Sequence, residues 1–299
     1  MHPGGAGIAD MRGGFDGCPA LPGLLRGADC KKGNRMETGD DPVVIRHREL
    51  ERYANTALKA GRIMMESGAS VSVVHRGITM IARGFGVETI GLRSGYTSIA
   101  MTVHVADQTI TRMLQVGRLG VNHRLDLAVR QLCARAERGG MSVEEVEAEL
   151  ARLVRETPRH AAWFTALAVG LACASFGRLL GVDWLAFGPV WLAGAIGQYI
   201  RHHLLHRGVN IFIVAGAIAF LSATLGGLGA IALQSATVQL AMMASILLLV
   251  PGVPSTNAQT DIMDGYPTMG SARAVWVLMI MLFAATGIWF AEELLGMRS

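Results

Sequence analysis

PGVPSTNAQTDIMDGYPTMGSAR, residues 251–273, interrupts the apolar second half of the chain and decides how that half folds. Pro251 and Pro254 stand at its start, and proline breaks a helix because it lacks a backbone donor. Backbone groups freed at membrane depth are tolerated only where protein or a polar cavity satisfies them. Interrupted membrane helices often surround a transported solute. The stretch therefore predicts a broken membrane helix beside a transport path.

Polar side chains inside this stretch are spaced so that they share one helical face. Asn257, Asp261 and Asp264 follow one another at intervals of four and three residues. Arg273 is predicted to neutralise one of the two carboxylates. A charge buried near the bilayer is costly and functional by default, whereas in a plain cytoplasmic loop the same acids are solvated. The residues predicted to line the transport path are Pro251, Gly252, Asn257, Asp261, Asp264 and Arg273.

Apolar stretches surround this segment at residues 161–180, 184–200, 209–228, 230–250 and 274–290. A helix needs about 20 apolar residues to cross a bilayer, with about 17 as the lower limit. The uncharged glycines at 226–229 are predicted to form a turn, because the apolar sequence around them is too long for one span. Gly188 and Pro189 are expected to kink the second stretch. We predict an α-helical membrane domain over residues 159–299 with about five transmembrane helices.

Basic residues mark the ends of the predicted spans. Cytoplasmic loops carry an excess of basic residues, so both basic loops belong inside. The intervening loops are residues 181–183 and the glycine turn, and the tail carries Glu292 and Glu293. This predicts a multi-pass inner (cytoplasmic) membrane protein with a cytoplasmic N-terminus and an external C-terminus. The basic groups are Arg152, Arg155, Arg159 and His160 before the first span, and Arg201, His202, His203, His206 and Arg207 between the second and third.

The more polar sequence before the first span predicts a small cytoplasmic α+β domain over residues 46–158. Apolar residues recur at helical spacing from His47 to Ser67, and Ser70 is placed to cap a second helix. β-branched residues then predict an antiparallel sheet, and Ser142 with Glu145 predicts a capping box. The strands are expected at 87–92, 98–105 and 109–116 with a turn at 106–108, and later helices from Val121 to the Gly139-Gly140 pair and from Ser142 to Thr157. Residues 1–45 are rich in Gly, Pro and Asp, which predicts a disordered segment.

The sequence lacks the motifs of several other protein classes. It contains no Gly-x-Ser-x-Gly or His-Glu-x-x-His pattern, which argues against a membrane-embedded hydrolase, so no catalytic residue is predicted. His202 and His206 have the i, i+4 spacing of shared metal ligands, but no carboxylate or cysteine stands nearby. The cysteines form no CxxC pair, and a net charge of +4 is too small to suggest nucleic acid. We therefore predict a protein that is not an enzyme and has no metal, cofactor or nucleic-acid partner.

The combined pattern resembles the threonine/serine exporter (ThrE) family over residues 46–290. It consists of Pro251-Gly252, Asn257, Asp261, Gly265, Gly270 and Arg273, with Gly68-Ala69 after the first helix, the Thr-Arg pair within 109–116, and Val121-Asn122. The resemblance implies export of small hydroxy amino acids, threonine or serine, driven by an ion gradient. Long members carry a second set of membrane helices, which this chain lacks where it stops at Ser299. It is therefore more similar to the YjjP half of the split YjjP/YjjB pair, which is linked to export of succinate, a dicarboxylate.

The resemblance also implies partners and residue roles. A small YjjB-like membrane protein is expected to complete the pathway, and further copies of this chain are a second expected partner. Asn257 would bond an ammonium or hydroxyl group, Asp261 or Asp264 would pair with an ammonium or relay a proton, and Arg273 would meet a carboxylate. Threonine and serine are the first predicted substrates and a dicarboxylate such as succinate is the alternative. A membrane-anchored sensor or scaffold, whose soluble domain binds a ligand, is the third hypothesis.

Overall fold

The structure is a computed structural model that describes residues 47–87, 89–105, 108–157 and 160–297. The predicted disordered segment 1–45 lies outside the described residues, and so do the first two residues of the predicted turn at 106–108. The described part is mostly helical, and a single small sheet precedes the apolar helices. This agrees with the predicted helical architecture and with the place of the sheet in the chain.

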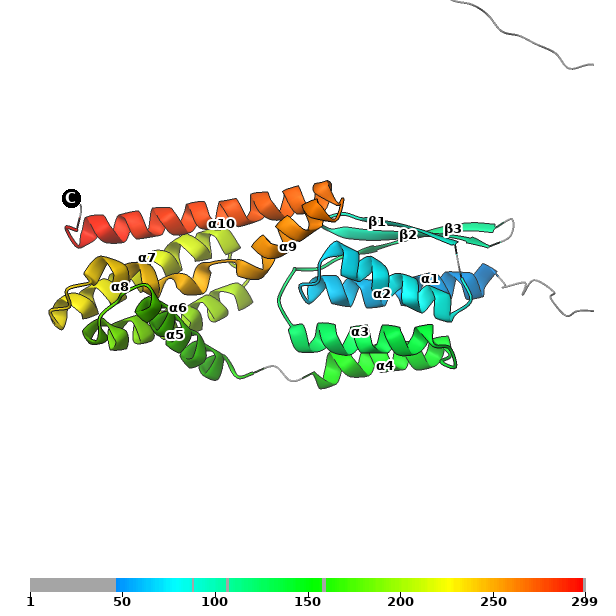
Figure 1. Ribbon diagram of the computed structural model, residues 1–299, viewed down its shortest axis with the longest axis horizontal. Helices are drawn as coiled ribbons and strands as arrows, with labels where there is room; N and C mark the ends of the chain where they lie inside the picture. The colour runs from blue at the N-terminus through cyan, green and yellow to red at the C-terminus, as the bar shows by residue number, and fades with distance from the viewer. Residues whose placement is uncertain (1–46, 88, 106–107, 158–159, 298–299) are drawn as a thin grey trace, which may run out of the picture. The chain divides into compact units, whose positions relative to one another are not determined.

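The N-terminal half consists of a sheet and two pairs of helices (Figure 1). Its elements are α1 (His47–Glu66), α2 (Val71–Gly84), β1 (Thr89–Ser94), β2 (Ser98–Val105), β3 (Gln108–Gln115), α3 (His123–Glu137) and α4 (Val143–Glu156). The sheet is antiparallel in the order β1-β2-β3, with Gly91 opposite Thr102 and Thr102 opposite Thr111. β2 and β3 contact α1, which also contacts α2, α3 and α4. α1 is therefore the central helix of this half.

One apolar cluster joins these elements. Leu58 and Met64 of α1, Ile78 of α2, Ile99 of β2 and Leu132 of α3 are all fully buried in it. Burying a side chain of this size stabilises a fold by about 1.5–3 kcal/mol before entropic costs. The apolar faces of the helices and of the strands therefore pack into the same interior.

Helix ends in this half follow the sequence in part. The capping box is confirmed, because the Ser142 side chain accepts from the Glu145 amide and Glu145 reaches back to the Ser142 amide. The prediction for Ser70 is wrong in one respect: it occupies the N-cap position of α2, but its side chain makes no capping hydrogen bond. The first amide of α2 is satisfied by a residue from a distant part of the chain, as described below.

The C-terminal half contains the apolar helices. They are α5 (Ala162–Leu179), α6 (Trp184–His206), α7 (Ile211–Ala232), α8 (Val238–Ser245), the 3-10 turn η1 (Leu247–Leu249), α9 (Gly252–Met263) and α10 (Pro267–Leu294). Three of them, α5, α7 and α10, are long and apolar enough to cross a membrane. A fourth span results if the bent pair Val238–Leu249 and Gly252–Met263 is counted as one. The described residues thus provide three or four candidate spans, compared with the predicted number of about five.

The difference from the prediction lies in α6. This helix has 23 residues and continues through Pro189, but it is not among the candidate spans of the described part of the chain. Glycines, Pro189, Gln198 and Arg201 reduce its hydropathy. α6 nevertheless packs between α5 and α7.

The predicted glycine turn is wrong. Residues 226–229 lie inside α7, which continues to Ala232, and the chain turns at Gln234, whose φ is 54°. Helical glycines let neighbouring helices approach closely, as in many membrane bundles. A Cβ at Gly226 would collide with Ser245 Oγ of α8, and one at Gly229 would lie 2.7 Å from Pro189 of α6. These glycines are therefore packing positions.

The contacts of small residues also give the helix directions. Gly197 packs against Ser222 and Gly229 packs against Pro189, so α6 and α7 are antiparallel. The order of contacts along α7 and α10 shows that these two helices are parallel. The contacts that set this direction are Gly216 with Phe283 and Gly227 with Leu295.

Candidate functional site

The helix break lies at Pro251. The helical segments before and after it, Val238–Leu249 and Gly252–Met263, are bent by 63°. Pro251 is the N-cap residue of α9, whereas Pro254 lies in the first turn of that helix, where the missing N–H has no intrahelical acceptor to lose. The predicted break is therefore present, with Pro254 inside the new helix. Gly252 is exposed, and a Cβ there would meet nothing within 4 Å.

A buried ion pair joins the two helices after the break. Arg273 Nη1 of α10 donates to Asp261 Oδ2 of α9 at 2.6 Å, and the two side chains are 4% and 0% exposed. Charges this deeply buried need partners for their remaining donors and lone pairs. Both find them on the backbone that connects α1 and α2.

Three hydrogen bonds join that connection and the first residue of α2 to the C-terminal half. Asp261 Oδ1 accepts from the Val71 amide at 2.8 Å, and Arg273 Nη2 donates to the Ala69 carbonyl at 3.0 Å. Asn257 Nδ2 donates to the Gly68 carbonyl at 2.7 Å. We call the set of Gly68, Ala69, Val71, Asn257, Asp261 and Arg273 the joint.

Local backbone chemistry explains why the joint forms here. Gly68 has φ +97°, a left-handed conformation that ends α1. The first amides of α2 have no intrahelical acceptor, and the positive end of the helix dipole favours an anion. Because Ser70 does not cap α2, Asp261 supplies the acceptor from α9. The carboxylate thus caps one helix and belongs to another.

Apolar and aromatic contacts surround the joint. Met269 of α10 is 1% exposed and belongs to the apolar cluster of the N-terminal half. His75 of α2 meets Tyr266 edge to face at 5.1 Å and forms a 2.8 Å hydrogen bond with Ser94. Burial lowers the pKa of His75. Burial also raises the pKa of Tyr96, and the positive charge of Arg273 offsets part of this rise.

The structure therefore brings together half of the predicted path residues. Asn257, Asp261 and Arg273 meet at the joint, and Asp261 is the carboxylate that Arg273 neutralises. Asp264 is exposed at the end of α9 and takes no part. Sequence reasoning missed the partners of these side chains, since they are backbone atoms roughly 190 residues away. The one available signal was the Gly68-Ala69 pair, which entered only through the family resemblance.

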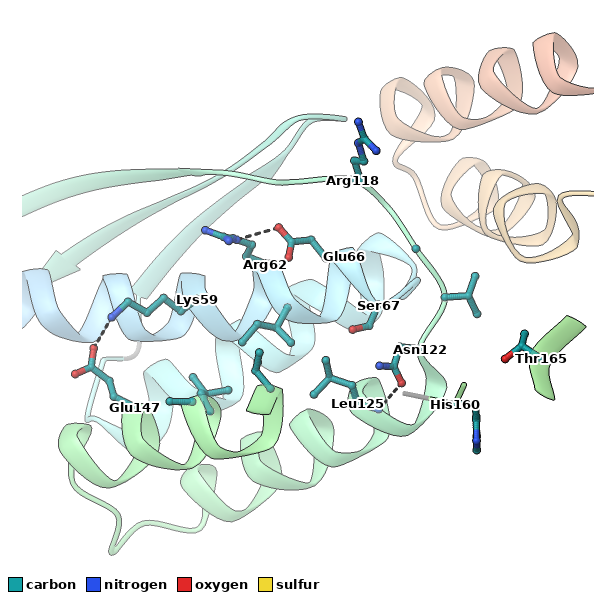
Figure 2. A pocket seen from close by; sticks show the side chains of 16 residues that line it. Lys59, Arg62, Glu66, Ser67, Arg118, Asn122, Leu125, Glu147, His160 and Thr165 are labelled. Carbon is teal, nitrogen blue, oxygen red and sulfur yellow. Dashed lines mark hydrogen bonds and ion pairs between the residues drawn. The ribbon is translucent and has the colours of Figure 1, made fainter. Parts of the chain in front are cut away.

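A cavity of about 1000 Å³ opens beside the joint, lined by α1, the segment between β3 and α3, α4 and the start of α5. Figure 2 shows two charged pairs in its wall, Lys59 with Glu147 at 2.8 Å and Arg62 with Glu66 at 2.9 Å, and Arg118 at its edge. Glu66 also accepts from the Gly117 amide. The residues that form the cavity wall next to Gly68 are Glu66 and Ser67. The cavity and the joint thus share the end of α1.

The chemistry available at the joint is positioning of the helices that it connects. The buried carboxylate and guanidinium are each satisfied by protein atoms. In the described residues no group of three or more His, Cys, Asp or Glu side chains could hold a metal, and the His202 and His206 rings lie 4.2 Å apart at the end of α6. The arrangement fixes the bent helix to the N-terminal half.

Comparisons with known proteins identify a family and two named relatives. Residues 55–295 match the family described as "Putative threonine/serine exporter". The chain is 29% identical over 253 residues to "Probable succinate transporter subunit YjjP" of Klebsiella aerogenes, covering 84% of this chain and 96% of that protein. It is 28% identical over 245 residues to the protein of the same name from Escherichia coli K12, covering 81% and 94%. No solved structure matches the chain.

Proposed function

This chain belongs to the threonine/serine exporter family, and on that premise we propose that it is one subunit of an inner-membrane exporter for a small carboxylate-bearing metabolite. The observation that carries the proposal is the helix break at Pro251, where a segment of membrane-span composition bends by 63°. Discontinuous membrane helices place free backbone groups where a polar solute can use them. Pro251 and Gly252 would line the path at this point.

A dicarboxylate of the succinate class is the first substrate candidate. Its support is the name of the two relatives, which the chain matches over nearly their whole length. Threonine and serine, the first prediction from the sequence, become the second candidate, supported by the description of the family. The two classes share a carboxylate and differ in the ammonium group, so a transport assay separates them.

A second subunit is part of the proposal. The relatives are named as subunits, and a small YjjB-like membrane protein is the expected partner, with homo-oligomers of this chain as the other arrangement. Membership of a transporter family also favours a protein without catalytic activity. The sensor or scaffold hypothesis predicts ligand binding without solute movement, which the transport assay tests as well.

We propose that the chain has five membrane spans. The fifth is α6, whose polar residues lower its mean hydropathy. α6 is antiparallel to α7, as expected if both cross the bilayer. The joint holds the α9–α10 segment against the α1–α2 connection, so both lie on one side of the membrane. The basic loops before α5 and after α6 favour the cytoplasm for that side. Cysteines placed at Gly181 and Gly208 should react with an impermeant thiol reagent from outside and inside, respectively; the reverse pattern would refute this orientation.

Three of the predicted path residues have a positioning role in this proposal. Asn257, Asp261 and Arg273 position the bent pair through the joint, since each is held by protein atoms. Asp264 is solvated and is expected to contribute little. The joint would let a change in the N-terminal half alter the angle at Pro251.

Efflux from loaded cells tests the proposal. A strain without its own exporters would express this chain, the partner or both, and efflux of labelled succinate and threonine would be followed. We expect succinate efflux to require both proteins. Threonine efflux without succinate efflux would favour the second candidate. If neither solute left the cells, both substrate proposals would be contradicted.

A further inference from the structure

The C-terminal part of α6 carries a guanidinium without an acidic partner. Arg201 is half-buried, and its one described hydrogen bond joins Nη1 to Gln198 Oε1 at 3.3 Å. In the part of the chain that the structure describes, Arg201 forms no ion pair with a carboxylate. A positive charge in apolar surroundings is costly and marks a functional position by default.

The other arginines of the apolar helices differ from Arg201. Arg273 is paired with Asp261. Arg178 donates to the Val182 carbonyl and lies over the Trp184 ring, 4.5 Å from its centroid. Arg207 is exposed at the end of α6, where water solvates it. Arg201 thus combines partial burial with the lack of an anionic partner within the described ranges.

A buried hydroxyl lies where the same face of α6 packs against α7. Gly197 lies one turn before Arg201, and a Cβ there would collide with Ser222 Oγ of α7. The Ser222 hydroxyl is fully buried and has no hydrogen-bond partner among the described residues. A buried polar atom without a partner costs about 1–3 kcal/mol unless a ligand or water satisfies it. Two unsatisfied groups, one cationic and one a hydroxyl, therefore lie along one helix interface.

This interface adjoins the helix break. A Cβ at Gly197 would lie 3.4 Å from Leu248 of η1, and the chain reaches Pro251 three residues later. Apolar residues of α6, α7 and η1 form a common cluster here, including Leu204, Ile218 and Leu249. A solute at the break would thus be close to the face of α6 that carries Arg201.

We propose that Arg201 binds a carboxylate of the transported solute. The guanidinium offers paired donors that match a carboxylate. Gln198 orients the guanidinium, and the Ser222 hydroxyl offers a further donor on the same interface. The inference rests on the proposed function, because the solute must carry a carboxylate. It assigns recognition of the solute to Arg201, a residue that the sequence placed only among the basic residues of a predicted cytoplasmic loop.

If Arg201 only anchored the helix end at the membrane surface, its variants would behave differently. A basic residue that only fixes the helix end is replaceable by lysine, has no effect on KM for the solute and acts alike for all substrates. A carboxylate-binding arginine is sensitive to lysine, because an ammonium lacks the paired donors. The same change at Arg207, exposed on the same helix end, serves as the matched control.

The test uses the chain with its membrane partner in proteoliposomes, with succinate as the probe. Arg201→Gln should raise KM for succinate at least about tenfold, since removing one partner of a desolvated charge pair costs more than the 1.4 kcal/mol that corresponds to tenfold. Arg201→Lys should lie between Arg201→Gln and the wild type, and Arg207→Gln should equal the wild type. An unchanged KM in Arg201→Gln, or full recovery by Arg201→Lys, would overturn the proposal.

Binding to the purified complex keeps the two proposals apart. Succinate should raise the melting temperature of the wild type and of Arg207→Gln and leave that of Arg201→Gln unshifted. If the wild type exports neither succinate nor threonine yet binds succinate through Arg201, the exporter proposal fails and the site stands. If the wild type exports succinate and Arg201→Gln still binds it, the site fails and the exporter stands. Should Arg201→Gln not fold, Arg201→Lys is the second variant, because it keeps the charge and removes the paired donors. A raised KM for succinate in Arg201→Lys supports the site, and a wild-type KM overturns it.

Discussion

The joint and the C-terminal end of α6 each contain an arginine, and the two arginines differ in whether a carboxylate neutralises them. At the joint, Arg273 has its anion built in, and the pair is satisfied by the backbone of a helix connection. On α6, Arg201 contacts the amide oxygen of Gln198 and no anion among the described residues. A saturated pair fixes one geometry and has no capacity for a ligand. The comparison indicates that one arginine holds the protein together and that the other is available to a solute.

Breaking the saturated pair should have the largest effect. Asp261→Asn leaves the Arg273 charge buried without its counter-ion, which costs about 3–5 kcal/mol. We expect transport to be lost and the melting temperature to fall, with membrane insertion unchanged. Insertion, melting and succinate efflux would be measured side by side.

Two variants control this experiment. Asp264→Asn changes an exposed acid of the same helix and should behave as the wild type. The double change Asp261→Leu with Arg273→Met removes both charges and should recover part of the lost stability, because no buried charge is left unpaired. If Asp261→Asn melts as the wild type does, the joint does not support the fold.

The turn that receives the joint should be the next most sensitive position. Gly68→Ala places a Cβ at φ +97°, 2.8 Å from the Gly120 carbonyl. Gly139→Ala meets the same backbone problem at φ +80° but has open space around it. The left-handed conformation alone costs about 1–2 kcal/mol, so Gly68→Ala should lose more stability than Gly139→Ala. Equal losses in chemical unfolding would show that the contact with Gly120 is unimportant.

Acid should weaken the surroundings of the joint through His75. Burial lowers the pKa of this histidine in the folded protein, so the unfolded chain binds a proton at a higher pH than the folded chain. The free energy of unfolding therefore falls as the pH drops below the ordinary histidine pKa of about 6.5. His75→Gln should reduce this decline when melting is compared at pH 7.5 and pH 5.5. A decline of the same size in both proteins would assign the acid sensitivity to other groups.

The smallest effect is expected for an exposed ion pair. Arg52 of α1 and Glu144 of α4 lie 2.5 Å apart, and both side chains are at least half exposed. Water and salt screen such pairs, and many contribute nothing measurable. Glu144→Gln should therefore melt at the wild-type temperature, in contrast to Asp261→Asn. A large loss would mean that the link between α1 and α4 matters more than burial indicates.

Much of the fold was predictable because its signals are local. The capping box at Ser142 and Glu145, the antiparallel strands and the break at Pro251 each follow from residues a few positions apart. The wrong glycine turn shows the limit of local reasoning. Glycines at 226–229 look like a turn in isolation, and only the packing of α8 and α6 against them explains why the helix continues.

The candidate site was predictable in its residues and unpredictable in its partners. Spacing placed Asn257 and Asp261 on one face, and the presence of Arg273 suggested a neutralising charge. The acceptors and donors that complete the joint are main-chain atoms of Gly68, Ala69 and Val71, and main-chain atoms carry no residue-specific signal. Arg201 was placed among basic residues at a helix end, because sequence cannot distinguish an exposed cation from a half-buried one.

Succinate binding and melting of two purified variants test the contrast between the arginines most directly. We expect Arg201→Gln to raise the Kd for succinate by about tenfold or more at an unchanged melting temperature. We expect Arg273→Gln to lower the melting temperature and to leave the Kd of the folded protein unchanged. The opposite result, a weaker Kd in Arg273→Gln at an unchanged melting temperature, would place the solute at the joint and contradict the account.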